Sequence, residues 1–184
     1  MTHSNVYPFK TKPYEHQEHA WSRSRDLEEF ALFMDMGTGK SKVIIDNLAY
    51  LYDSGRIDSA LIVAPKGTYQ NWTRNEIPTH MPDHIMVDTA AWYASPKKKE
   101  AEKLEKILNP SHNLRVLVMN VESFSSAKGV KYAETFMRCS GSTMMVVDES
   151  TTIKNPKAKR TKSLVRVGIQ AKYKRILTGE PVTR

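Results

Sequence analysis

The sequence predicts an α/β fold in which a parallel β-sheet is flanked by helices on both faces. Several short runs are continuously apolar, as expected of strands that are covered on both faces. Segments with helical periodicity lie between these runs. The length of 184 residues, with 40% hydrophobic and 26% charged residues, suits one globular domain with a substantial core. We therefore treat residues 1–184 as a single domain.

The apolar runs define six expected strands, and five segments with helical spacing alternate with them. The strands are 30–34, 60–64, 85–87, 116–119, 144–147 and 176–177, and the helices are 41–51, 68–80, 96–108, 130–139 and 159–169. Crossovers between parallel strands are right-handed, and ligands bind at the carboxyl ends of such strands. The residues that directly follow each apolar run are therefore the first candidates for function.

The charge of the chain favours a polyanionic partner. The formal net charge is +8, from 28 basic and 20 acidic residues, and such an excess favours nucleic acid above all. The single cysteine, Cys139, excludes an internal disulfide and indicates a reducing compartment. We find neither a signal-peptide pattern at the N-terminus nor an apolar stretch of membrane-spanning length.

A glycine-containing turn follows the first expected strand and leads into a helix. Its sequence from Met34 is Met-Asp-Met-Gly-Thr-Gly-Lys-Ser. Gly37 and Gly39 allow a tight approach to phosphate oxygens, and Thr38 lies between them. Lys40 is expected to reach the β- and γ-phosphates of ATP, and the Ser41 hydroxyl is expected to bind Mg²⁺. An ordinary glycine-rich turn is the weaker interpretation.

Two acidic residues follow the buried run 144–147. Asp148 and Glu149 would stand at the end of a strand in the same sheet as the phosphate loop. A carboxylate in that place suits magnesium, and a second one can orient and deprotonate the attacking water. We assign Asp148 to the metal and Glu149 to the water. With Lys40, these two carboxylates form the predicted catalytic set.

These motifs resemble the first RecA-like domain of superfamily II helicases, a P-loop NTPase domain. The chain is most similar to the Swi/Snf-like branch, which is common in phages and prophages, and the resemblance extends from about Tyr14 to Arg184. The matching segments are 14–17, 35–41, 64–68 with 71–72, 120–123, 148–149 with 153–155, and 177–181. The resemblance implies ATP and Mg²⁺ as cofactors and DNA as the partner.

The resemblance also implies roles for individual residues. Gln17 falls where the family has a glutamine that reads adenine, which suits the donor and acceptor of its amide; a surface glutamine is the alternative. Thr178, Gly179 and Thr151 fall in segments that couple hydrolysis to domain movement. The implied contacts to the nucleic-acid backbone are Lys66, Gly67, Thr68, Asn120, Glu122, Ser123 and Lys154.

Three positions depart from the family pattern. Thr151 stands where histidine is usual, Glu180 where threonine is usual, and Arg184 where many members have asparagine. None of these changes removes a group that binds phosphate or metal. The first two concern the coupling of the ATP site to movement.

The residue chemistry gives separate grounds for a backbone contact. Lys66, Gly67 and Thr68 combine a cation, an accessible amide and a hydroxyl before a helix, which is a phosphate-binding composition. Trp72 is expected in the core, with base stacking as the alternative. A basic cluster is either a further contact or a solvated loop; it comprises Lys154, Lys157, Lys159, Arg160 and Lys162.

We expect the ATP-binding N-terminal domain of an ATP-dependent DNA helicase or translocase. Motors of this type hold ATP between two RecA-like domains, and the second domain supplies arginines to the γ-phosphate. We expect this chain to bind nucleotide, to hydrolyse it poorly alone and to require a second RecA-like domain. The expected location is the cytoplasm, which is the host cytoplasm if a phage encodes the protein.

Three other functions share parts of this pattern. The motor subunit of a restriction enzyme uses the same core. A nucleotide-dependent nucleic-acid-binding module without motor activity is favoured by Thr151 and Glu180. A small-molecule kinase would explain the phosphate loop but would leave Gln17 and the segments 64–65 and 177–179 without a role.

Overall fold

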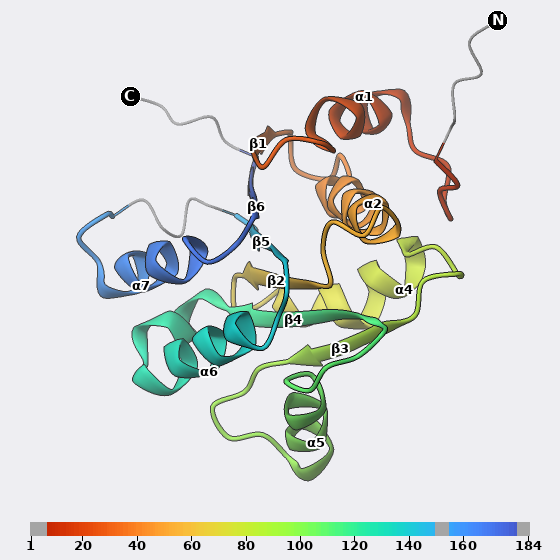
Figure 1. The fold of residues 1–184 in the computed structure, drawn as a ribbon. Coiled ribbons are helices and arrows are strands. Elements are labelled where there is room, and N and C mark those ends of the chain that lie inside the picture. Colours follow the sequence, from red (N-terminus) through yellow and green to blue (C-terminus); the bar gives the residue numbers. More distant parts are fainter. Residues whose placement is uncertain (1–6, 150–154, 180–184) are drawn as a thin grey trace, which may run out of the picture.

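A computed structural model describes residues 7–149 and 155–179. Six parallel strands form one sheet in the order β1-β6-β5-β2-β4-β3 (Figure 1). The strands are β1 (Glu29–Phe33), β2 (Ser59–Ala64), β3 (Val87–Ala91), β4 (Leu114–Asn120), β5 (Thr143–Val147) and β6 (Tyr173–Thr178). The predicted α/β fold with a parallel sheet is confirmed.

Helices cover both faces of this sheet, as predicted (Figure 1). One face carries α1 (Glu15–Ser24), α2 (Lys40–Asp53), α3 (Tyr69–Asn71), the π-helix η1 (Trp72–Glu76) and α4 (Ile77–His80). The other carries α5 (Lys98–Lys106), the 3₁₀-helix η2 (Val121–Ser125), α6 (Ala127–Arg138) and α7 (Lys159–Gly168). Alternate side chains of β2 enter the two cores, which explains its unbroken apolar run.

The structure differs from the expected elements in several places. The apolar run 85–87 precedes most of β3, because Ile85 is buried in the connection and the strand begins only at Val87. The expected helix 68–80 is divided into α3, η1 and α4. Pro78 has no N–H to donate and its ring crowds the preceding turn, and the wider π-helical turn lies directly before it. Neither helix α1 nor the 3₁₀-helix η2 was predicted.

None of the helices in residues 7–149 and 155–179 is long and apolar enough to cross a membrane.

A buried arginine joins β6 to the segment between α1 and β1. Arg175 is 1% exposed, and its Nε donates to the Asn47 side-chain oxygen at 3.0 Å. The two Nη atoms donate to four main-chain carbonyls, those of Ser24, Leu27, Glu28 and Lys174. All these acceptors are neutral, and burial lowers the pKa of Arg175 to about 10. The guanidinium thus satisfies carbonyls where the chain turns between elements.

We expect Arg175→Met to lower the free energy of unfolding by about 3 kcal/mol or more, because it leaves several buried acceptors without donors. Urea denaturation should show a lower midpoint with an unchanged slope. The matched control is Lys174→Met. Lys174 contacts Glu29 at 2.9 Å in an exposed ion pair, so its loss should cost less than about 1 kcal/mol. Equal losses for the two variants would contradict this account of Arg175.

Candidate nucleotide and nucleic-acid site

The predicted functional segments meet at one edge of the sheet. All six strands are parallel, so their carboxyl ends lie on the same side. The phosphate loop follows β1, the acidic pair follows β5, and Thr178 ends β6. The segment that begins at Lys66 follows β2, and Asn120 ends β4. The structure therefore brings together the segments predicted to bind ATP and nucleic acid, at the edge where ligands bind on such a sheet.

The phosphate loop has backbone conformations that require its two glycines. Gly37 has a φ of 77° and Gly39 a φ of 82°, both in the left-handed region. A Cβ atom on Gly39 would also lie 2.3 Å from the Gln17 Nε2. Helix α2 begins directly afterwards at Lys40, so Ser41 lies in its first turn. The loop thus presents a helix N-terminus of the kind that binds phosphate.

Lys40 extends back over the loop that precedes it. Its Nζ donates to the carbonyl oxygens of Met34 at 2.9 Å and Asp35 at 3.0 Å. A Cβ atom built on Gly179 would lie 3.7 Å from the same Nζ and 3.0 Å from the Met36 Cγ. Gly179, one of the predicted coupling residues, therefore packs directly against the phosphate loop and its lysine.

Gln17 connects α1 to the phosphate loop. Its side chain is 4% exposed. The Oε1 accepts from the Tyr14 N–H, and the Nε2 donates to the Thr38 carbonyl, both at 3.0 Å. A surface position for Gln17 is thereby contradicted, because the amide is buried against the loop. A glutamine amide has two N–H donors and two acceptor lone pairs, so one of each remains for a ligand.

A cavity of about 750 Å³ lies between the N-terminal segment and the phosphate loop. Tyr14, Gln17 and Gly39 line it, and Lys42 and His80 form part of its wall. Tyr14 is 71% exposed and stacks on the His16 ring with 5.8 Å between the centroids. The cavity thus has an exposed aromatic ring and the predicted phosphate loop, at Gly39, in its lining.

Asp148 continues the line of β5 and is largely enclosed. Its N–H donates to the Val63 carbonyl at 2.7 Å, and its Oδ2 accepts from the Trp72 Nε1 at 3.2 Å. Burial raises the pKa of Asp148, and the neighbouring Glu149 carboxylate acts in the same direction. The Trp72 hydrogen bond and the Lys40 charge act against this rise. A bound cation would stabilise the charged form of this carboxylate.

Glu149 has an unusual backbone conformation. Its φ is 55°, and it has the only positive φ found at a non-glycine residue in ranges 7–149 and 155–179. Such a conformation costs of order 1–3 kcal/mol and is concentrated at functional sites. Glu149 therefore departs from the extended backbone of β5 two residues after that strand ends.

The predicted backbone contacts are only partly at the surface. Lys66, Gly67 and Thr68 are exposed at the end of β2, and Glu122 is exposed on η2. The Asn120 side chain instead caps η2 by accepting from the Ser123 N–H at 2.9 Å. Ser123 is 4% exposed, and its hydroxyl donates to the Asn120 carbonyl at 2.6 Å. This inward position leaves Ser123 almost no surface for the contact that the sequence suggested.

Trp72 belongs to the core, as predicted, and is 2% exposed. Base stacking is therefore excluded for its ring in this structure. The sequence reasoning missed its hydrogen bond to Asp148, since periodicity gives no information on which partner an indole N–H finds. Lys66–Thr68 lead directly into the helical segment that carries Trp72. The exposed end of β2 is thus linked to the acidic residue by a short run of chain.

Some predicted residues lie outside the part of the chain that the structure describes. They are Thr151 and Lys154, together with the departures Glu180 and Arg184. Thr178 is described and is 3% exposed at the end of β6. The β1 residue Phe33 pairs with Thr178 in the sheet, and the Met34 N–H donates to the Thr178 carbonyl at 3.3 Å. Thr178 therefore abuts the strand that leads into the phosphate loop.

Comparison with known proteins gives a family match over almost the whole chain. The model of the SNF2-related domain matches residues 14–184. ATP-dependent helicase FUN30 of Saccharomyces cerevisiae is 30% identical over 148 residues, which are 80% of this chain and 12% of the relative. Protein CHROMATIN REMODELING 24 of Arabidopsis thaliana is 30% identical over 179 residues, 94% of this chain and 16% of the relative. The chain thus spans less than a fifth of the length of these relatives.

The fold is also found among solved structures. The SWI2/SNF2 ATPase core of Sulfolobus solfataricus in complex with dsDNA superposes with a TM-score of 0.73 at 20% sequence identity. The similarity covers 98% of this chain and 35% of that one. At this identity the comparison supports the fold, which is that of a RecA-like ATPase core.

Proposed function

Because the chain belongs to the SNF2-related domain family, we propose that it is the ATP-binding domain of a DNA-dependent helicase or translocase. The observation that carries this proposal is the convergence of three features at one edge of the sheet. These are the phosphate loop at 37–41, the acidic pair Asp148 and Glu149, and the exposed cation-bearing turn at 66–68. Nucleotide chemistry and polyanion contact can therefore act on one another over a short distance.

In this proposal the phosphate loop and α2 hold the triphosphate of ATP. The main-chain amides of Gly37, Thr38 and Gly39 donate to phosphate oxygens, and Lys40 exchanges its loop carbonyls for the β- and γ-phosphates. The base enters the cavity beside Gln17, whose remaining N–H and lone pair match the edge of adenine. Tyr14, at the rim of the cavity, offers a ring for stacking.

Mg²⁺ fits the oxygen groups at this edge. The Ser41 hydroxyl and the Asp148 carboxylate are the ligand types that it prefers, and the raised pKa of Asp148 marks a carboxylate that a cation would stabilise. Bound there, Mg²⁺ would neutralise charge on the phosphates. Glu149 accepts the proton of the attacking water as general base. Its backbone is in the left-handed region, with a φ of 55°.

DNA is proposed to cross the ends of β2 and β4. Lys66, Gly67 and Thr68 follow β2 and would contact DNA phosphates there. Asn120 and Glu122 lie at the end of the neighbouring strand β4. Contacts of this kind position a duplex without reading its sequence, which suits a motor that steps along any sequence. The Trp72 hydrogen bond to Asp148 gives a route by which a DNA contact at 66–68 can reach the ATP site.

A complete motor in this proposal places ATP between this domain and a second RecA-like domain that supplies arginines. Thr178 and Gly179, which adjoin the phosphate loop, would pass domain closure to the nucleotide, with Thr151 as a further coupling residue. We also propose a phage or prophage origin and the cytoplasm of the host cell as the place of action. Both rest on the branch that the motifs resemble.

A test of this function is ATP hydrolysis by the full-length protein with and without duplex DNA. We expect DNA to stimulate turnover, and we expect the stimulation to fall as salt is raised because phosphate contacts release counterions. An ATPase rate that ignores DNA would instead support a nucleotide-dependent binding module. If the full-length protein shows DNA-stimulated turnover and also cleaves DNA, the motor of a restriction enzyme would be the better description.

A further inference from the structure

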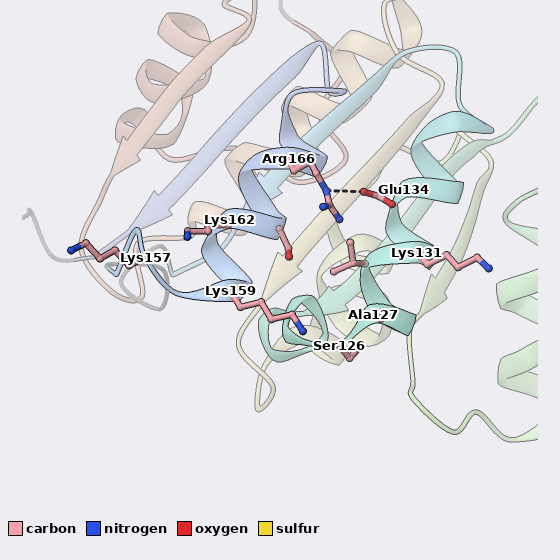
Figure 2. A pocket seen from close by; sticks show the side chains of 10 residues that line it. Ser126, Ala127, Lys131, Glu134, Lys157, Lys159, Lys162 and Arg166 are labelled. Atoms are coloured by element: carbon pink, nitrogen blue, oxygen red, sulfur yellow. Dashed lines mark ion pairs between the residues drawn. The ribbon is translucent and has the colours of Figure 1, made fainter.

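The face of the sheet opposite α2 carries a basic groove between α6 and α7. Its volume is about 630 Å³, and Figure 2 shows the side chains that line it. Five cations border it, Lys131, Lys157, Lys159, Lys162 and Arg166, against the single carboxylate of Glu134. This excess of four positive charges is half of the +8 carried by the chain. We call this concavity the α6–α7 groove.

One ion pair crosses the groove and leaves most of its cations available. The Arg166 Nε contacts the Glu134 Oε1 at 3.0 Å, joining α7 to α6. Lys159 and Lys162 are exposed, and Figure 2 shows the Lys159 side chain pointing toward the start of α6 near Ser126 and the Lys131 side chain pointing away from α7. Lys159, Lys162 and Arg166 lie three and four positions apart on α7, so they form a row about 10 Å long on one helix face.

The groove opens toward the same edge of the sheet as the proposed DNA contacts. Helix α6 begins two residues after η2, which follows β4 and carries Glu122. Helix α7 packs against η2 and follows β5 through the segment after the acidic pair. Both helices therefore turn their N-terminal ends, with the positive end of the helix dipole, toward that edge. The groove therefore lies beside η2, the segment that follows Asn120.

We propose that the α6–α7 groove is a second contact for the backbone of the DNA duplex. The proposal rests on the proposed function, and it extends the DNA contact beyond the family motifs. A row about 10 Å long matches roughly three phosphates of one strand, since a strand carries one charge per 3.4 Å of helix axis. Cations border the groove, as sequence-independent backbone binding requires, and the side chains of Ala127 and Val130 also line it.

The test is the affinity of the full chain for a fluorescein-labelled duplex, measured by anisotropy at several salt concentrations. The groove variant is Lys159→Glu with Lys162→Glu. The matched control is Lys98→Glu with Lys99→Glu, which makes the same charge change at exposed positions of α5 outside the groove. We expect the groove variant to bind about 10-fold or more weakly and the salt slope to fall by about 2, as for two lost phosphate contacts.

The control variant should keep the salt slope and most of the affinity, and both variants should bind ATP like the unaltered chain. Lys159→Gln with Lys162→Gln should give an intermediate loss without adding like-charge repulsion. Equal behaviour of the groove and control variants would overturn the groove while leaving the proposed function intact. Failure of the unaltered chain to bind duplex, with or without ATP, would count against the proposed function itself. Binding of labelled polyglutamate is measured in parallel. If the groove variant loses polyglutamate binding but keeps DNA binding, the occupant is an acidic polypeptide and the proposal is overturned.

Discussion

Glu149→Gln is expected to stop ATP turnover while leaving ATP binding intact. The substitution keeps the size and hydrogen-bonding reach of the side chain but removes its ability to accept a proton at neutral pH. A positioned general base contributes about 10²- to 10⁴-fold to a rate, so we expect a loss of that order. The measurement is the rate of phosphate release by the full-length protein with DNA, together with ATP affinity at equilibrium.

The backbone at Glu149 makes this test sharper than a substitution elsewhere. Its φ of 55° is unfavourable for glutamate and glutamine alike. The unfolding free energy should therefore hardly change, and a lost rate cannot be attributed to a lost fold. A second variant, Glu149→Gly, removes the base and relieves the strain, so it should be as inactive but at least as stable. Full turnover in Glu149→Gln would transfer the role of base to another group.

The candidate functional residues could be placed together from the sequence, because the carboxyl ends of parallel strands lie at one edge of the sheet. The apolar runs at 60–64 and 144–147 correspond to strands covered on both faces, and these are β2 and β5. The residues after them, Lys66 and Asp148, could therefore be placed together from the sequence. Shorter apolar runs were less informative. At 85–87, a buried connection has the same apolar composition as a strand.

Contacts between distant segments were not predictable from the pattern. The Trp72 hydrogen bond to Asp148, the Gln17 hydrogen bond to Thr38 and the Arg175 network each join parts of the chain that are far apart in sequence. The acceptors of Arg175 are carbonyl oxygens. No acidic residue in the sequence therefore indicates that this arginine is buried. The inward position of Ser123 is a local effect, because its hydroxyl donates to the Asn120 carbonyl instead of facing solvent.

Lys40→Ala is expected to abolish measurable ATP binding. In the structure the Lys40 ammonium already donates to the Met34 and Asp35 carbonyls, which shows that it reaches across the whole phosphate loop. Two hydrogen bonds from a charged donor are worth about 1.5–3 kcal/mol each, so their loss to phosphate weakens binding by at least about 100-fold. Isothermal titration with Mg·ATP measures the effect directly on this chain.

Lys40→Ala removes both a positive charge and two hydrogen bonds to the carbonyls of the loop. Two further variants separate these roles. Lys40→Arg keeps the charge and the donors but replaces a point charge by a planar fork, so it should bind ATP weakly while keeping the loop closed. Lys98→Ala removes a lysine from the exposed surface of α5 and should leave ATP affinity unchanged. If Lys40→Ala bound ATP as tightly as the unaltered chain, residues 37–41 would be an ordinary strand-to-helix turn. The acidic pair and the basic groove would then need a function other than ATP-driven movement on DNA.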